Sequence, residues 1–147
     1  MDVVSLIERH NGLITTMGQG KSGHLAALMA SLLNSIGIPA RYMSVSDAEH
    51  GELGGLGGDM VIVVSHSGHI PDGLTSPILI TANPRHGVIN YIVPSVNEST
   101  GTDLPLNRSL ALHGAINDII SSLIKRTGFT NEQFKLNHPA GSIGLTR

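Results

Sequence analysis

The chain contains no cysteine and no tryptophan, and aromatic residues make up only 3% of its 147 residues. Without cysteine there can be no disulfide, no thiolate zinc site and no cysteine nucleophile. An absence of disulfides agrees with a reducing compartment, so a cytoplasmic location is expected. With so few aromatic rings, the core must be packed from Leu, Ile, Val, Ala and Met, as suits a sheet covered by helices.

Charge is also sparse. Charged residues account for 14% of the chain, and nine Lys and Arg against eleven Asp and Glu give a formal net charge of -2. Nucleic-acid binding by counterion release needs a basic stripe, which these scattered cations do not provide. No apolar run approaches the roughly 18 to 20 residues of a membrane span, and the N-terminal residues lack the basic region of a signal peptide. We therefore expect neither a nucleic-acid nor a membrane partner.

The residues that are present indicate one folded domain. Hydrophobic residues make up 40% of the chain, which excludes a solvated disordered chain and a coiled coil. A length of 147 residues suits one hydrophobic core. We expect a single domain over residues 1–147, with a short N-terminal helix at 2–10, an α/β core at 11–128 and a C-terminal tail at 129–147.

Apolar periodicity alternates between strands and helices along the chain. Strands are predicted at Leu13–Met17, Arg41–Val45, Met60–Val64, Pro77–Thr81 and Val88–Val93, and helices at Asp2–Glu8, Ser22–Ile36, Leu110–Arg126 and Asn131–Leu136. The alternation predicts an α/β fold, a three-layer sandwich with a central, mostly parallel sheet flanked by helices. Such sheets bind ligands at the carboxyl ends of their strands, so function is expected in the loops after Met17, Val45 and Val64.

The loop after the first strand reads GQGKSG from Gly18 to Gly23. It matches the dinucleotide pattern G-x-G-x-x-G between a strand and a helix. In a dinucleotide site the next strand needs only an acidic residue to bind the ribose, whereas here that strand leads into a long Gly-rich stretch. A Walker A loop is excluded because Thr15 stands where its first glycine should be. Exposed amides at a helix start, with Lys21 and Ser22, predict an anion site. A glycine turn with no ligand is the alternative.

The loop after the third strand reads SHSG from Ser65 to Gly68. The hydroxyls of Ser65 and Ser67 can donate to phosphate oxygens, and an ordinary polar turn is the alternative. A serine nucleophile paired with His66 is disfavoured because the G-x-S-x-G elbow is absent. The spacing of His66 and His69 does not match H-E-x-x-H, so no metal site is expected.

Two further histidines lie in segments that no packing rule demands. His50 is part of EHGELG, from Glu49 to Gly54, and His138 is part of NHPAGSIG in the C-terminal tail. Glycine in both segments, with proline in the second, is typical of loops. Each histidine is a candidate functional residue, with an ordinary surface or structural position as its alternative.

In order and approximate spacing, four segments of this sequence resemble sugar isomerase (SIS) domains: GQGKSGH, EHGELG, SHSG and FKLNHPAGSIG. The resemblance extends from Gly12 to Gly144 and is closest to arabinose-5-phosphate isomerases. It implies a flavodoxin-like or Rossmann-like fold and a sugar-phosphate site. That site would contain Lys21, His50, Glu98, His138 and an acid after the serine loop.

Several features depart from the family pattern. Asp72 stands where the family usually has Glu, and Ile70 replaces a threonine of the serine loop. The helix that should follow that loop is missing. The sequence carries no paired CBS regulatory domains, so the resemblance implies a minimal, stand-alone version.

The resemblance implies an aldose–ketose isomerase that interconverts D-arabinose 5-phosphate and D-ribulose 5-phosphate through an enediol, without metal or other cofactor. Glu98 is expected to be the base that moves a proton between the two carbons. The other catalytic residues expected are Lys21 for charge neutralisation, His138 for ring opening or proton shuttling, and His50 and Asp72 as orienting or relay groups. The expected substrate-binding residues are Gly20, Ser22, Ser65, His66 and Ser67.

Two other functions stay open from the sequence. A non-catalytic phosphosugar-binding module is favoured by the departures at Asp72 and Ile70, and a dinucleotide-binding dehydrogenase fragment is the third possibility. A homo-oligomer, a dimer or tetramer, is expected because the missing helix leaves a sheet face that a second copy would cover. The resemblance implies active sites shared between subunits, and the tail carrying His138 could reach a neighbour's glycine loop.

Overall fold

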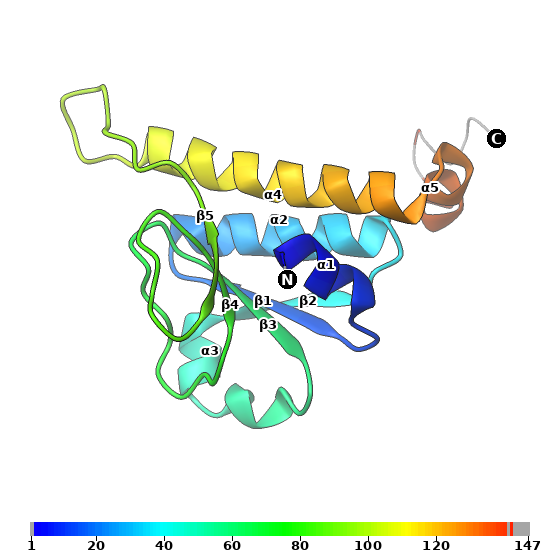
Figure 1. Ribbon diagram of the computed structural model, residues 1–147, viewed down its shortest axis with the longest axis horizontal. Coiled ribbons are helices and arrows are strands. Elements are labelled where there is room, and N and C mark those ends of the chain that lie inside the picture. Colours follow the sequence, from blue (N-terminus) through cyan, green and yellow to red (C-terminus); the bar gives the residue numbers. More distant parts are fainter. Residues whose placement is uncertain (1, 141, 143–147) are drawn as a thin grey trace.

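The computed structural model describes residues 2–140 and 142, and its centre is a five-stranded parallel sheet (Figure 1). The strands are β1 (Ile14–Gly18), β2 (Ala40–Ser44), β3 (Met60–Val64), β4 (Ile78–Thr81) and β5 (Ile89–Ile92), in the order β2-β1-β3-β4-β5. Every residue of β1 and β4 is buried. Continuous apolar runs are typical of parallel strands covered on both faces, so the predicted α/β fold with a mostly parallel sheet is confirmed.

One face of the sheet is covered by the short helix α1 and two long helices (Figure 1). These are α1 (Val3–Arg9), α2 (Lys21–Ser35) and α4 (Leu106–Thr127), and their apolar sides form the larger core cluster with the sheet. Helices α2 and α4 begin at the same end of the molecule and run side by side. Gly128, at φ 67°, ends α4 in the left-handed conformation that glycine favours.

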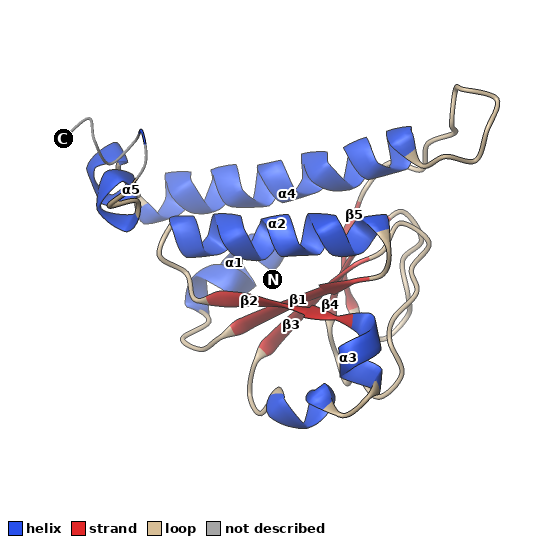
Figure 2. Ribbon diagram, turned by 180° about the vertical axis from the view of Figure 1, so that it is seen from behind, coloured by secondary structure: helices blue, strands red, loops and turns tan. Residues whose placement is uncertain are grey.

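The other face has a thinner cover (Figure 2). It consists of α3 (Val45–Glu49), the 3-10 helix η1 (Glu52–Gly55) and loops, over a small cluster centred on Met17, Met43 and Leu79. The predicted three-layer arrangement is therefore confirmed with unequal outer layers. Residues 65–77, all of them described, contain no helix, as predicted from the sequence.

The predicted boundaries lie within one residue of the observed ones, except at the start of the long helix, which differs by four residues. The second strand was predicted to extend to Val45, but Val45 begins α3 because the Ser44 hydroxyl caps that helix, accepting the Asp47 amide at 3.0 Å. The long helix was predicted to begin at Leu110 and begins at Leu106 instead. The short α5 (Asn131–Asn137), opened by a capping box of Thr130 and Gln133, confirms the last predicted helix.

The strand order places the functional loops. From β1 the chain crosses through α2 to β2 on one side, and then returns to β3 on the other side of β1. The loops that follow β1 and β3 therefore leave the same edge of the sheet in different directions. Open α/β sheets bind ligands in the crevice at such a switch in strand order. None of the helices in residues 2–140 and 142 is long and apolar enough to cross a membrane.

Candidate anion-binding site

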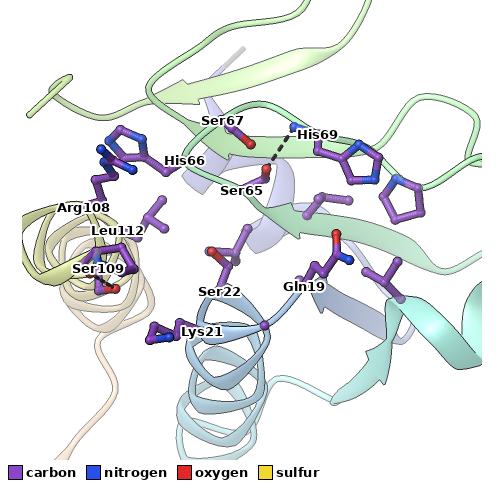
Figure 3. A pocket seen from close by; sticks show the side chains of 17 residues that line it. Gln19, Lys21, Ser22, Ser65, His66, Ser67, His69, Arg108, Ser109 and Leu112 are labelled. Carbon is purple, nitrogen blue, oxygen red and sulfur yellow. Dashed lines mark hydrogen bonds between the residues drawn. The ribbon is translucent and has the colours of Figure 1, made fainter. Parts of the chain in front are cut away.

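A cavity of about 360 Å³ lies at the switch point, between the carboxyl ends of β1 and β3 (Figure 3). Three segments form most of its wall: residues 18–22 after β1, residues 63–69 at the end of β3 and beyond it, and residues 105–112 at the start of α4. Val45 and Pro71 complete the lining. Two of the three loops expected to carry function therefore form the cavity, and the start of α4 is an addition.

The β1–α2 turn needs its glycines for close packing. A Cβ at Gly18 would lie 2.6 Å from the Ser22 carbonyl oxygen, and one at Gly23 would lie 2.7 Å from the Gly18 carbonyl oxygen. Gly20 has φ 56° and leads into α2 without any side-chain cap. Since the first amides of a helix have no partner inside it, the turn presents uncapped N–H groups beside Lys21 and Ser22. The loop therefore has the close packing of a glycine turn, and it also has the uncapped amides that the anion-site prediction requires.

The serine loop is held tightly against the end of β4. The Ser65 hydroxyl accepts the His69 amide at 2.9 Å, and the His66 carbonyl accepts the Asn83 side-chain amide at 2.9 Å. Gly68 has φ 80°, and a Cβ there would collide with the Asn83 carbonyl. A fixed loop of this kind keeps the Ser65 and Ser67 hydroxyls at the cavity wall at little further entropy cost on binding.

Arg108 enters the cavity from the first turn of α4 and was not predicted as a site residue. Figure 3 shows its guanidinium beside the ring of His66. Burial lowers the pKa of His66, and the positive charge of Arg108 lowers it further. His66 Nε2 is buried and has no hydrogen-bond partner among the described residues. His66 is therefore held in its neutral form near pH 7.

Glu98 lies behind this wall rather than in the cavity. Its Oε2 accepts the Asn107 amide at 2.9 Å and its Oε1 accepts the Arg108 amide at 3.1 Å, while Arg108 Nε lies 3.6 Å from Oε1. The side chain is only 3% exposed. Burial acts to raise the pKa of Glu98, but the two amides and the Arg108 charge outweigh it, so the pKa is lowered. Glu98 thus caps α4, which has no side-chain cap of its own.

The charges that line the cavity favour an anion. Lys21 and Arg108 contribute cations, and Ser22, Ser65 and Ser67 contribute hydroxyls, whereas the Ser109 hydroxyl donates to the Pro105 carbonyl at 2.5 Å. Within the described part of the chain, no Asp or Glu lines the cavity. Cationic and hydroxyl donors without a competing carboxylate suit an anionic ligand such as a phosphate.

Six of the ten predicted site residues line this cavity: Gly20, Lys21, Ser22, Ser65, His66 and Ser67. The sequence missed His69 and Ser109 as well as Arg108. His69 had been considered only as a metal ligand, and in residues 2–140 and 142 no group of three or more His, Asp or Glu side chains could hold a metal ion. Ser109 and Arg108 had no signal, because the helix that presents them was predicted to start after them.

The other four predicted residues are not brought into the cavity of this chain. Glu98 is bound to α4, Asp72 is exposed one residue beyond the cavity wall, and exposed His50 ends α3 with its Nδ1 2.7 Å from the Ser46 carbonyl oxygen. Ile70, which replaces the family's threonine, packs on the small cluster of the thin face. The ten predicted site residues are therefore not gathered in one place within a single chain, and the prediction of a site shared between subunits stays a prediction.

His138 lies farthest from the cavity. Its ring packs on Phe134 with centroids 4.1 Å apart, and its Nε2 is 3.5 Å from the Ser35 hydroxyl at the last residue of α2. Lys21 begins the same 15-residue helix, so the two ends are separated by about 20 Å at 1.5 Å per residue. Within one chain, His138 and the cavity lie at opposite ends of α2.

Comparisons with known proteins give two different matches. A Transglutaminase-like superfamily model matches residues 8–72, less than half of the chain. The chain has no cysteine, so it lacks the thiol needed for acyl transfer by a cysteine nucleophile. Arabinose 5-phosphate isomerase KdsD of Yersinia pestis is 31% identical over 155 residues, covering 94% of this chain and 47% of that protein.

Solved structures agree with the similarity to arabinose 5-phosphate isomerase. A Listeria monocytogenes protein assigned as a sugar-phosphate isomerase superposes with a TM-score of 0.81 at 27% identity, covering 93% of this chain and 81% of that one. The resemblance to sugar isomerase domains is confirmed. This chain, with its five-stranded parallel sheet and flanking helices, has the sugar isomerase fold, and it spans about half the length of the curated relatives it matches.

Two structures of lower identity share the sugar isomerase fold alone. One is an Escherichia coli CFT073 protein in complex with arabinose 5-phosphate, with a TM-score of 0.80 at 23% identity, covering 93% of this chain and 82% of that one. The other is the sugar isomerase domain of an RpiR transcription factor from Sphaerobacter thermophilus, with a TM-score of 0.59 at 17% identity, covering 92% and 80%. The same fold therefore occurs both in a sugar-phosphate-binding protein and in a transcription factor.

Proposed function

We propose that this chain is an aldose–ketose isomerase acting on a sugar phosphate, with D-arabinose 5-phosphate and D-ribulose 5-phosphate as the preferred pair. The observation that supports this most strongly is the cavity at the strand switch point, where Lys21, Arg108 and four serines gather without a carboxylate among the described lining residues. The similarity to arabinose 5-phosphate isomerases over most of the chain supports the choice of substrate.

The phosphate binds first in this proposal. The Ser65 and Ser67 hydroxyls and the amides near Ser22 hold its oxygens, and Lys21 supplies charge at the start of α2. Binding energy from the phosphate then positions the sugar carbons for reaction. A volume of about 360 Å³ falls at the lower end of the range of about 300 to 1,000 Å³ typical of small-molecule sites.

The chemistry needs one base and one group that stabilises the developing oxyanion. A base takes the proton from C2 of the aldose to give an enediol and returns it at C1, while a second proton moves between O1 and O2. We assign the base role to His138 of a second copy of the chain. Lys21 is placed to neutralise charge on the enediolate. His50 and Asp72 keep their predicted roles as orienting or relay groups.

A phosphosugar-binding module without catalysis is the second candidate. It is favoured by one feature: no carboxylate of the described residues lines the cavity, so an obvious proton acceptor for the carbon is missing there. The RpiR structure has the same fold in a transcription factor. The two candidates share the ligand and differ only in turnover.

Incubation with a panel of pentose and hexose phosphates, analysed by chromatography for isomer pairs, separates them. We expect conversion of D-arabinose 5-phosphate without added metal or nucleotide, and loss of conversion in Lys21→Ala. Ligand binding without any isomer formation would favour the binding module. If a chelator abolishes turnover and an added metal restores it, the metal-independent mechanism is wrong.

A further inference from the structure

We propose that Arg108 is a second cationic anchor for the substrate phosphate and that Glu98 is a positioning residue which orients it, rather than the base. This inference deepens the proposed function and rests on it for the identity of the ligand. It assigns a binding role to a residue that the serine and glycine motifs do not include.

Only one of the three guanidinium nitrogens of Arg108 faces a carboxylate in the described part of the chain. Its Nε edge faces Glu98, with 3.6 Å between Nε and Oε1. In the described part of the chain, its two terminal NH2 groups have no hydrogen-bond partner and form no ion pair with a carboxylate. Those two groups carry four of the five N–H donors of a guanidinium. The edge suited to bidentate contact with a phosphate is therefore unoccupied by protein groups.

The Arg108 side chain points toward the cavity. Arg108 lines the cavity, its side chain is 39% exposed, and Figure 3 shows the guanidinium next to His66 of the serine loop. Lys21 enters the same cavity from α2. Two cations from two helices thus border one cavity with the serine hydroxyls, an arrangement that suits a dianion better than a monoanion.

Glu98 binds the start of α4 and does not line the cavity. Both of its oxygens accept backbone amides of α4, and the side chain is almost fully buried. A base must lie within hydrogen-bond reach of the proton it removes, and a carboxylate with a lowered pKa outside the cavity does not meet that need. Its contacts instead fix the first turn of α4 and the Nε edge of Arg108. Glu98 therefore acts on the ligand through Arg108.

The test is a titration of the full chain with inorganic phosphate at constant ionic strength, followed by amide NMR shifts. We expect Arg108→Gln to weaken phosphate binding about tenfold or more, because a charge-assisted bidentate contact is lost, and Arg108→Lys to lose part of that affinity. The matched control is Arg9→Gln, an exposed arginine of α1 outside the cavity, which should stay within about twofold of the wild type. Melting curves establish that each variant is folded.

Glu98→Gln measures the positioning role. We expect it to change the phosphate dissociation constant in the wild-type background and to have no further effect in Arg108→Gln, the signature of one residue acting through another. The same change in both backgrounds would show that Glu98 acts independently of Arg108. Phosphate binding by Arg108→Gln within about twofold of the wild type, or no binding by the wild type, would overturn the role of Arg108.

Turnover separates this inference from the proposed function. A chain that isomerises sugar phosphates with an unchanged KM in Arg108→Gln would keep the proposed function and refute the anchor. A chain that converts no sugar phosphate but loses phosphate binding in Arg108→Gln would keep the anchor and refute the isomerase. If both hold, Arg108→Gln should raise KM more than it lowers kcat.

Discussion

The two ends of α2 differ sharply in chemistry. At its first residue, Lys21 borders a polar cavity together with Arg108 and the serine loop. At its last residue, Ser35 contacts Asn137 and His138 of the C-terminal segment, and the His138 ring packs on Phe134. A cavity end and a histidine end on one helix can form a single site only if another copy of the chain brings them together.

Exposed leucines mark the start of α4 and the short helix α5. Leu106 and Leu110 near the cavity are 51% and 68% exposed, and Leu136 near His138 is 66% exposed. A two-fold dimer with antiparallel α4 helices would place the histidine end of one chain against the cavity end of its partner and bury all three side chains. The oligomer remains a prediction. In such a dimer, the two different ends of α2 would contribute to the same site.

The largest effect is expected at the cavity end. Lys21→Ala should reduce turnover by on the order of a hundredfold and raise KM, because the lysine touches charge present in both the bound substrate and the transition state. Steady-state kinetics with D-arabinose 5-phosphate measures both constants. A change confined to kcat would place Lys21 at the enediolate alone, and an unchanged enzyme would remove it from the site.

The second experiment joins the two ends. His138→Ala alone should be strongly impaired, and mixing it with Lys21→Ala should restore part of the activity, since a mixed dimer contains one site with an intact Lys21 and an intact partner histidine. Assays of mixed and unmixed variants, with light scattering for the oligomeric state, measure this. An active monomer, or mixed oligomers that stay inactive, would show that the histidine end does not serve the cavity.

The cavity end was largely predictable from the sequence. The run MVIVV and the glycine loop identify two parallel strands, and parallel strands bring their carboxyl ends to one edge of the sheet. The SHSG and GQGKSG loops therefore had to lie close together. The thin face was predictable too, since the sequence has no helical stretch between Val64 and Pro77.

The roles of Glu98 and Arg108 could not be predicted, because they depend on a tertiary cap. Helix α4 starts at Leu106 without a side-chain cap of its own, and its first amides are satisfied by Glu98 from a preceding loop. No local pattern of the kind read from sequence describes such a cap. With the helix start placed four residues late, Arg108 was assigned to a loop and Glu98 remained available as a base.

The third prediction concerns the proton itself. If Glu98 positions Arg108, Glu98→Gln should alter KM several-fold and still incorporate solvent deuterium into the product at a rate close to kcat. If Glu98 is the base that the family resemblance implies, label incorporation and turnover should fall together by about a hundredfold or more. Mass spectrometry of the product formed in heavy water distinguishes these outcomes. Loss of label would return Glu98 to the catalytic role and contradict our assignment.

The smallest expected effect is a pair of opposite changes in the pKa of His66, followed by NMR of its ring protons. Burial and the Arg108 charge lower that pKa, whereas the Glu98 charge raises it. Arg108→Gln should therefore raise the pKa of His66 and Glu98→Gln should lower it, while Arg9→Gln, at an exposed residue outside the cavity, should leave it unchanged.

Stability follows from the same pKa. Because the folded state disfavours the charged ring, the unfolded state takes up its proton first as pH falls, so stability is lost as pH drops through about 6.5, the ordinary histidine value, toward the lowered value in the fold. Arg108→Gln should narrow the pH range over which this stability is lost, and melting temperatures measured at a series of pH values test this. An upward pKa change in Glu98→Gln would contradict the predicted lowering. No change in either variant would show that the guanidinium does not lie beside this ring in solution, and the cavity would lose the second cation on which its preference for a dianion rests.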